Sequence, residues 1–315
     1  MPATDFPASP PKSKILPWLQ LFRLSAAPSA ISNILVGFLL VNSEWSPIGP
    51  LLLLIASSFF LYSAGMLSND IADVRRDRAQ RRPRPLAQDW IGLPQARLVC
   101  LILFALGILL PAAVGSRSLI IALLLGISIL LYNGPLKRTW SGPIFMGACR
   151  SLNIMLGASY LPLDTSILMN SGMPSTVEWI AISLGILIAG LTYFAKNEAG
   201  TSSRWQLTLG SLIILFGLTG FATAGWIDTE NPNNASLFAG LILLISAPVI
   251  IRLIWAIRSC QSQPIQFAVI SLLKTLIIYD AAFCLLVGQP NFFYALIVLS
   301  LWIPSFVLGK WVKST

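Results

Sequence analysis

Ten apolar stretches of about 20 residues each run along this chain, and they constrain its fold more than any other feature. A helix of that length spans the roughly 30 Å hydrocarbon core of a bilayer. Only 10% of the residues are charged, against about 25% in soluble domains. The sequence therefore predicts an all-α polytopic membrane protein with nine or ten transmembrane helices. The stretches cover residues 18–41, 48–68, 95–114, 116–132, 142–162, 176–195, 205–226, 235–257, 266–287 and 292–311.

Lysine and arginine residues gather in alternate loops between these stretches. The loops on the other side hold Arg117 and several acidic residues. The positive-inside rule places the basic loops in the cytoplasm, and we expect the membrane to be a bacterial inner (plasma) membrane. Residues 1–14, rich in Pro, Ser and Ala, predict a disordered cytoplasmic leader before one transmembrane domain at 15–315. The basic loops comprise Lys12 to Arg23, Arg75 to Arg97, Lys137 and Arg138, Lys196 to Arg204, Arg258, and Lys310 to Lys313.

Several function classes are excluded by residues that the sequence lacks. The chain has no histidine, which excludes His-dependent triads, His-ligated haem and His proton relays. Its four cysteines form no Cys-x-x-Cys pair, so neither a disulfide framework nor a zinc site is indicated. Because the basic residues are spread over short loops, nucleic-acid binding is not expected. The sequence leaves the oligomeric state open.

An acidic cluster lies where the second apolar stretch ends, in the run Asn69-Asp70-Ile71-Ala72-Asp73-Val74-Arg75-Arg76-Asp77. At about 100° per residue, a helix would project Asp70, Asp73 and Asp77 within roughly 60° of one another. Three neighbouring anions repel, and Mg²⁺ prefers carboxylate and phosphate oxygens. The spacing favours a Mg²⁺ site for a phosphorylated substrate. The alternative is a solvated helix end in which the aspartates balance the neighbouring arginines.

Two further groups of basic residues are candidates for substrate binding. Arg81, Arg82 and Arg84 follow the cluster within eight residues, and guanidinium groups bind phosphate in a bidentate way. The alternative is that this is only the most positive cytoplasmic loop. Arg150 and Asn153 share one helix face within an apolar stretch, where a buried arginine needs an anionic or carbonyl partner. They either line a cavity or pair with another helix for packing alone.

These motifs resemble those of the UbiA superfamily of intramembrane prenyltransferases. Asn69-Asp70-x-x-Asp73-x-x-x-Asp77 has the spacing of its first Asp-rich motif, and Arg84-Pro85-Leu86 looks like its Arg-Pro-Leu element. The segment Tyr132-Asn133-Gly134-Pro135-Leu136-Lys137-Arg138 is similar to its Tyr-Pro-x-x-Lys-Arg turn. Hydropathy and motif order agree over nearly the whole chain. The resemblance implies nine helices around a central cavity, with a prenyl diphosphate and Mg²⁺ at the cytoplasmic end and an apolar tunnel beyond.

The resemblance also implies residue roles. Asp70, Asp73 and Asp77 would hold Mg²⁺, with Asn69 as a neutral ligand or orienting group. The diphosphate would be gripped by Arg81, Arg82, Arg84, Lys137 and Arg138.

The chain departs from the superfamily at the second Asp-rich motif. The matching position reads Tyr193-Phe194-Ala195-Lys196-Asn197-Glu198-Ala199-Gly200, where only Glu198 is acidic. We expect Glu198 to be a catalytic residue and Lys196 and Asn197 to bind the substrate, with Lys196 as a fixed cation in place of a second metal. This version looks closer to the less characterised branch found in bacterial biosynthetic clusters.

The favoured hypothesis is a Mg²⁺-dependent membrane prenyltransferase that moves a prenyl group from its diphosphate to an aromatic or other lipophilic acceptor. A transporter or precursor carrier on the same scaffold is the alternative, with Arg150, Lys274 and Asp280 as its polar path. No inverted repeat supports that alternative. A phosphatidyl-alcohol transferase is a third hypothesis, but its Asp-Gly-x-x-Ala-Arg signature is absent.

Overall fold

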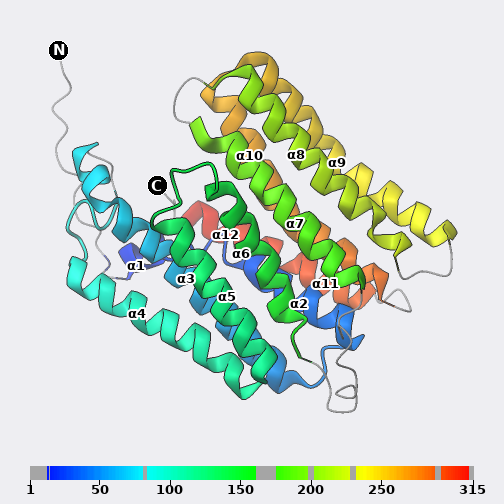
Figure 1. Cartoon of the computed structure of the whole chain (residues 1–315), viewed down its shortest axis with the longest axis horizontal. Helices are drawn as coiled ribbons and strands as arrows, with labels where there is room; N and C mark the ends of the chain where they lie inside the picture. The colour runs from blue at the N-terminus through cyan, green and yellow to red at the C-terminus, as the bar shows by residue number, and fades with distance from the viewer. Residues whose placement is uncertain are drawn as a thin grey trace.

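The computed structural model describes residues 13, 15–80, 84–160, 175–197, 202–227, 232–287 and 292–311. These residues form helices and contain no strand (Figure 1). The helices are α1 (Leu16–Leu21), α2 (Pro28–Asn42), α3 (Ile48–Ala79), α4 (Leu93–Leu109), α5 (Ser116–Asn133), α6 (Gly142–Gly157), α7 (Ser175–Phe194), α8 (Arg204–Thr223), α9 (Pro232–Ser259), α10 (Ser262–Phe283), α11 (Phe292–Ser300) and α12 (Trp302–Trp311). Short 3₁₀ turns extend α4, α7, α8 and α10.

The predicted all-α polytopic class is confirmed. Within the described ranges, eight helical segments are long and apolar enough to cross a membrane. The helices α2 and α6 are shorter, with 15 and 16 residues. The choice between nine and ten spans stays a prediction, because length and composition alone do not decide it.

Two of the predicted stretches are broken in the structure. The first stretch was expected to form one helix over 18–41. Instead, α1 ends at Leu21 and a second helix, α2, begins at Pro28. Arg23 in the turn between them has a φ of 46°, which no right-handed helix accommodates. The last stretch divides at Leu301 between α11 and α12. Pro304 lacks the backbone N–H that would bond the Ser300 carbonyl and join the two helices.

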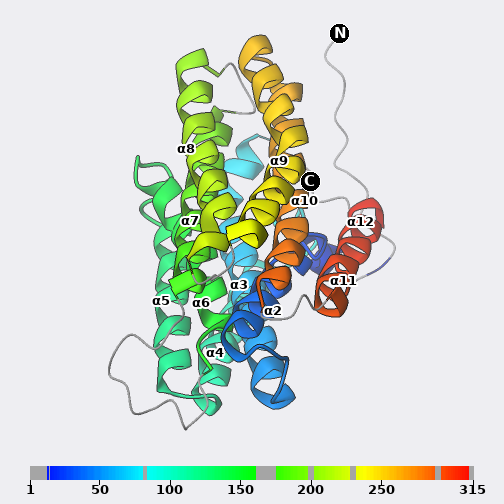
Figure 2. The same cartoon turned by 90° about the vertical axis from the view of Figure 1, so that its right-hand side faces the viewer.

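The helices pack around α2 and α6. Figure 1 shows α3, α4 and α5 on one side and α7 to α10 on the other, with α2 and α6 between them. The helix α2 packs against α3, α6 and α10, so it connects the two halves. Figure 2 shows α11 and α12 at the flank of the bundle beside α10. The cavity described below lies against this central part.

The backbones of α2 and α6 touch through two glycines. A Cβ added to Gly37 would lie 2.2 Å from the Ile154 carbonyl oxygen, and one added to Gly157 would lie 2.4 Å from the Ile34 carbonyl oxygen. Small residues at helix interfaces allow this close approach within membranes. The contact places the first two turns of α2 directly beside the polar face of α6.

A second, smaller apolar cluster holds the segment after α3 in place. Leu86 and Ile91 are buried against Leu67 and Val74 of α3 and Ala96 of α4. Burying such side chains contributes roughly 1.5–3 kcal/mol each. This anchor fixes the start of the segment, including Arg84, against the half of α3 that carries the acidic cluster.

Candidate functional site

A cavity of about 330 Å³ lies between α3, α5 and α6. One face of α3 lines it through Ser58, Tyr62, Met66, Asn69 and Asp73. These residues are three or four apart, the spacing that places side chains on the same side of a helix. From Ser58 to Asp73 the helix rises about 22 Å, at 1.5 Å per residue. The cavity therefore extends along α3 from within the bundle to the acidic cluster.

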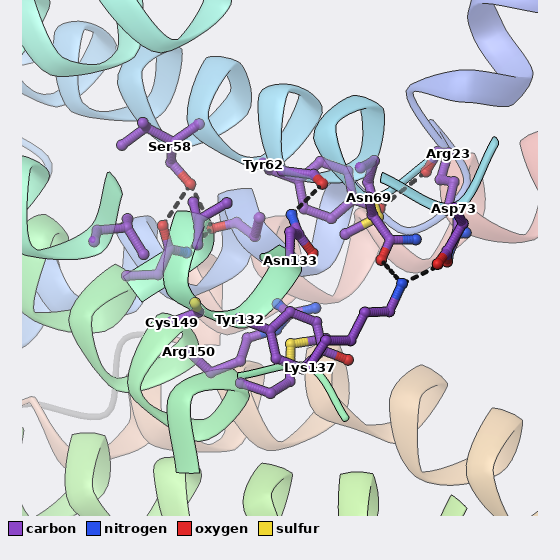
Figure 3. A pocket seen from close by; sticks show the side chains of 18 of the residues that line it. Arg23, Ser58, Tyr62, Asn69, Asp73, Tyr132, Asn133, Lys137, Cys149 and Arg150 are labelled. Atoms are coloured by element: carbon purple, nitrogen blue, oxygen red, sulfur yellow. Dashed lines mark hydrogen bonds and ion pairs between the residues drawn. The ribbon is translucent and has the colours of Figure 1, made fainter. Parts of the chain in front are cut away.

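Lys137 holds the two α3 residues at the mouth of the cavity. Its Nζ donates to Asn69 Oδ1 at 2.7 Å and to Asp73 Oδ2 at 2.5 Å (Figure 3). Lys137 lies in the turn between α5 and α6. Two side-chain oxygens one helical turn apart thus converge on one cation. The predicted placement of Asn69, Asp73 and Lys137 in one site agrees with this geometry.

The other two aspartates of the cluster converge on a different cation. Arg84 Nη1 lies 2.8 Å from Asp77 Oδ2 and 3.4 Å from Asp70 Oδ1. Asp70 also contacts Arg23 Nη2 at 3.4 Å. Asp70 and Asp77 are buried, and neither lines the cavity, whereas Arg84 and Arg23 do. Three carboxylates are therefore matched by three basic residues.

The structure thus divides the three predicted metal ligands between two sites. Among the described residues, no three or more His, Cys, Asp or Glu side chains gather in a group that could hold a metal ion. A shared metal site of Asp70, Asp73 and Asp77 stays a prediction. The Asn69 and Asp73 oxygens do fit a divalent cation, because they already face the same positively charged Lys137 nitrogen atom and are oxygen ligands of the kind Mg²⁺ prefers.

Arg23 is the site residue that sequence reasoning missed. In the sequence analysis Arg23 was only one of the basic residues predicted to lie in the cytoplasm. It stands five positions before Pro28, which begins α2. Its left-handed backbone turns the side chain toward the cavity, and the Tyr62 hydroxyl donates to its carbonyl oxygen at 3.1 Å. A non-glycine residue held at such a φ costs about 1 kcal/mol or more, and such residues cluster at functional sites.

The inner end of the cavity is polar and joins α6 to α2 and α3. Asn153 Nδ2 donates to the Ala30 carbonyl at 2.8 Å, and Ser58 Oγ donates to Asn153 Oδ1 at 2.7 Å. Arg150 Nη2 donates to Ser29 Oγ at 3.1 Å. The prediction that Arg150 and Asn153 share a face agrees with the structure, and both line the cavity. Figure 3 shows Arg150, Cys149 and Ser58 away from the group formed by Arg23, Asn69 and Asp73.

The remaining predicted site residues are not placed in the cavity by the described structure. Arg138 is exposed and does not line it. Lys196 is exposed in the 3₁₀ turn after α7. Arg81, Arg82, Glu198 and the side chain of Asn197 lie outside the described residues. Their predicted roles stay predictions.

The structure is a bundle of membrane helices whose cavity has a cation-rich mouth and a largely apolar wall, an arrangement suited to an amphiphilic phosphate. Residues 30–204 match the UbiA prenyltransferase family. The match covers more than half of the 315 residues, and the chain therefore belongs to this family. The predicted class of membrane prenyltransferase is confirmed at that level. Arg23, Asp280 and α8 to α12, apart from Arg204 at the start of α8, lie outside the matched range.

The relatives found by sequence are archaeal. Digeranylgeranylglyceryl phosphate synthase of Saccharolobus solfataricus is 26% identical over 195 residues, which cover 61% of this chain and 68% of the relative. The enzyme of the same name from Sulfurisphaera tokodaii is 29% identical over 123 residues, 38% of this chain and 44% of the relative. The chain thus matches less than half of the second relative's length. An integral membrane protein is confirmed, whereas the bacterial inner membrane and the orientation stay predictions.

Solved structures show the same fold. A UbiA homolog from Archaeoglobus fulgidus bound to GPP and Mg²⁺ has a TM-score of 0.60 and 17% identity, and the alignment covers 90% of this chain and 99% of that one. A UbiA homolog from Aeropyrum pernix has a TM-score of 0.63 and 15% identity, with 82% and 97% covered. The expected UbiA-like architecture is therefore confirmed.

Proposed function

We propose that this chain transfers a prenyl group from a prenyl diphosphate to a lipophilic acceptor, with the diphosphate bound at the cavity mouth on the cytoplasmic side. The observation that carries the proposal is the convergence of Asn69 Oδ1 and Asp73 Oδ2 on one cation at the entrance of a largely apolar cavity. A transporter of unrelated solutes has no need of this arrangement.

The mouth provides the positive charge that a diphosphate needs. Lys137, Arg84 and Arg23 line the cavity, and guanidinium and ammonium groups bind phosphate oxygens through charge-assisted hydrogen bonds. Asn69 and Asp73 would hold Mg²⁺. When bound, Mg²⁺ stabilises the charge that develops on the departing pyrophosphate. Asp70 and Asp77 act as positioning residues, because they fix Arg84 where it can reach a phosphate.

The wall between the mouth and the polar inner end suits a prenyl chain. It is formed largely by apolar side chains, and no carboxylate of the described residues lines the cavity beyond Asp73. A dry apolar environment excludes water from the reactive carbon and strengthens the electrostatic interactions at the phosphate end. The apolar lining consists of Leu61, Met66, Leu125, Ile129 and Met146, with Ala30 and Gly65 between them.

The transfer breaks one bond and forms one. The allylic C1–O bond breaks, and its electron pair leaves with pyrophosphate. An electron pair of the acceptor then forms the new bond to C1, and the acceptor releases a proton that the departing pyrophosphate can accept. The names of the relatives favour a glycerophosphate-type lipid as the acceptor, whose hydroxyl oxygen would be the nucleophile. The GPP and DMAPP bound in the fold neighbours support a prenyl diphosphate donor.

The test is retention of tritiated geranyl diphosphate by the detergent-purified chain, with Mg²⁺ or with EDTA. We expect retention in Mg²⁺, its loss in EDTA and its recovery when Mg²⁺ is restored. Release of pyrophosphate on addition of a glycerophosphate lipid would establish transfer. Retention that is indifferent to EDTA, or the absence of any retention, would contradict the proposal and favour the carrier alternative.

A further inference from the structure

Arg150 is the one cavity-lining cation of the described structure that has no ion pair. The other three, Arg23, Arg84 and Lys137, each contact a carboxylate of α3. Arg150 bonds only neutral groups, and its contacts are long. Its Nη1 lies 3.3 Å from the Ser29 carbonyl oxygen, and its Nη2 lies 3.1 Å from Ser29 Oγ. An arginine within a membrane bundle ordinarily pairs with an anionic group or with backbone carbonyls, and Arg150 has only the Ser29 carbonyl, at 3.3 Å.

A buried carboxylate lies behind Arg150, with the side chain of one residue, Asn33, between them. Asp280 of α10 is 2% exposed, and its Oδ2 accepts from Ser32 Oγ at 2.5 Å and from Asn33 Nδ2 at 2.9 Å. The other end of the same amide, Asn33 Oδ1, accepts from Arg150 Nη1 at 3.4 Å. The Asn33 side chain thus lies between the carboxylate and the guanidinium. Asp280 balances the charge of Arg150 without occupying its donors.

We propose that Arg150 binds the anionic headgroup of the acceptor, a phosphate monoester carried by a lipid, and that Asp280 is a positioning residue for Arg150. This inference rests on the proposed function, since it assigns the acceptor subsite of the same cavity. A planar guanidinium matches a phosphate with two parallel hydrogen bonds, and the long bonds to Ser29 are readily exchanged for them. The mouth cations already bind carboxylates, whereas Arg150 is available to a second anion.

Asp280 does not act on the acceptor itself. It does not line the cavity, and Asn33 separates it from Arg150. Its Oδ2 accepts hydrogen bonds from Ser32 Oγ and Asn33 Nδ2, so both contacts are to groups of α2 and neither is to a ligand in the cavity. We therefore assign it to charge balance and to the orientation of the Asn33 amide, rather than to proton transfer.

The first experiment measures phosphate binding without metal or prenyl donor. Thermal unfolding of the detergent-purified full chain is followed in EDTA with dodecyl phosphate, dodecanol or inorganic phosphate. We expect dodecyl phosphate to raise the unfolding temperature more than either of the others. Arg150→Gln should weaken dodecyl phosphate binding about tenfold, the loss typical of one charge-assisted hydrogen bond. The matched control is Arg252→Gln, because Arg252 is exposed on α9 and bonds Ser271.

The second experiment uses the charge of Asp280. Asp280→Asn keeps an oxygen for Asn33 but leaves Arg150 uncompensated, so the unfolding temperature without ligand should fall. Dodecyl phosphate then supplies the missing negative charge and should bind several-fold more tightly than to the wild type, an order-of-magnitude expectation for one buried charge. The double variant, with Arg150→Gln added, should recover the stability of the empty protein and lose the tight phosphate binding.

Three outcomes would overturn the inference. They are unchanged dodecyl phosphate binding in Arg150→Gln, equal binding of dodecyl phosphate and dodecanol, and weaker or unchanged binding in Asp280→Asn. With a glycerophosphate acceptor, Arg150→Gln should raise the acceptor KM and leave the geranyl diphosphate KM unchanged. A rise in the geranyl diphosphate KM alone would assign Arg150 to the diphosphate and overturn the acceptor subsite, while the proposed prenyl transfer would stand.

Discussion

Lys137 Nζ lies 2.5 Å from Asp73 Oδ2, and this contact joins the turn after α5 to the Asp73 end of the cavity-lining face of α3. The same nitrogen bonds Asn69 Oδ1, so the two α3 oxygens are held at a common point. The point between the two oxygens that we assign to a metal ion is therefore occupied by the Lys137 ammonium group. Any ligand that enters the mouth must rearrange this contact.

Asp73→Asn should abolish most activity without unfolding the bundle. The change removes the only carboxylate on the cavity wall of the described structure, and loss of one such charged group at a reacting phosphate costs about 100-fold in rate. Pyrophosphate release measures the effect. Asp89→Asn is the control, since Asp89 pairs with Arg78 on the exposed surface and should retain wild-type rates. Full release by Asp73→Asn would remove Asp73 from the site.

Arg84→Gln should lower the free energy of unfolding, because it removes the partner of two carboxylates at once. Arg84 bridges Asp70 and Asp77, both buried, and removing one partner of a buried ion pair costs about 3 kcal/mol. A fall in the thermal unfolding temperature in detergent would show this. Arg78→Gln breaks an exposed pair with Asp89, for which about 1 kcal/mol or less is expected. Equal effects of the two changes would argue against the bridging role of Arg84.

Arg23→Gln should weaken the binding of the prenyl diphosphate. The guanidinium lines the cavity and contacts Asp70, and the loss of one charged hydrogen-bond donor costs about tenfold in affinity. Equilibrium retention of tritiated geranyl diphosphate in Mg²⁺ is the measurement. Arg76→Gln removes a charge from the same region at an exposed position on α3, and its affinity should match that of the wild type. If both variants bind geranyl diphosphate alike, Arg23 has no role in binding the diphosphate and contributes only positive charge to its loop.

Gly37→Ala should separate α2 from α6. The new Cβ would meet the Ile154 carbonyl at 2.2 Å, and overpacking of a tight interface costs about 1–3 kcal/mol. Unfolding temperature and the KM for the acceptor should both respond, because Arg150 depends on its α2 partners. Gly49→Ala provides the comparison, since nothing lies within 4 Å of the added atom there. If Gly37→Ala leaves both the unfolding temperature and the acceptor KM unchanged, then close contact between α2 and α6 is not needed for stability or for acceptor binding.

The fold class and the cavity mouth were predictable for different reasons. Span-length apolar stretches indicate helices, since a bilayer core leaves few other ways to satisfy backbone polar groups. The spacing of Asn69 and Asp73 places them on one face of α3, and the family motif predicted that Lys137 would join them. The pairing of Asp70 and Asp77 with Arg84 was not predictable, because it depends on how Leu86 and Ile91 pack the chain against α3.

Other features depend on tertiary contacts between distant segments. The break between α1 and α2 follows from the left-handed backbone of Arg23. Pro28 was the signal in 18–41 for the start of a new helix, but the backbone of Arg23 had no signal in the sequence. The approach of Asp280 to Arg150 needs α2 to lie between α10 and α6, and α2 reaches that place through a backbone contact at Gly37 and Gly157. Helix periodicity assigns faces but not neighbours, so it placed Arg150 and Asn153 together and left their partners open.

The Lys137 ammonium group lies between Asn69 and Asp73, so a cation can bind these two oxygens only by displacing it. A divalent ion that binds alone would have to displace the Lys137 ammonium group and leave its positive charge without a counter-ion. We therefore expect free Mg²⁺ alone to bind weakly. A diphosphate offers the evicted ammonium a new counter-ion at the same moment. We therefore expect metal and donor to bind together rather than one after the other.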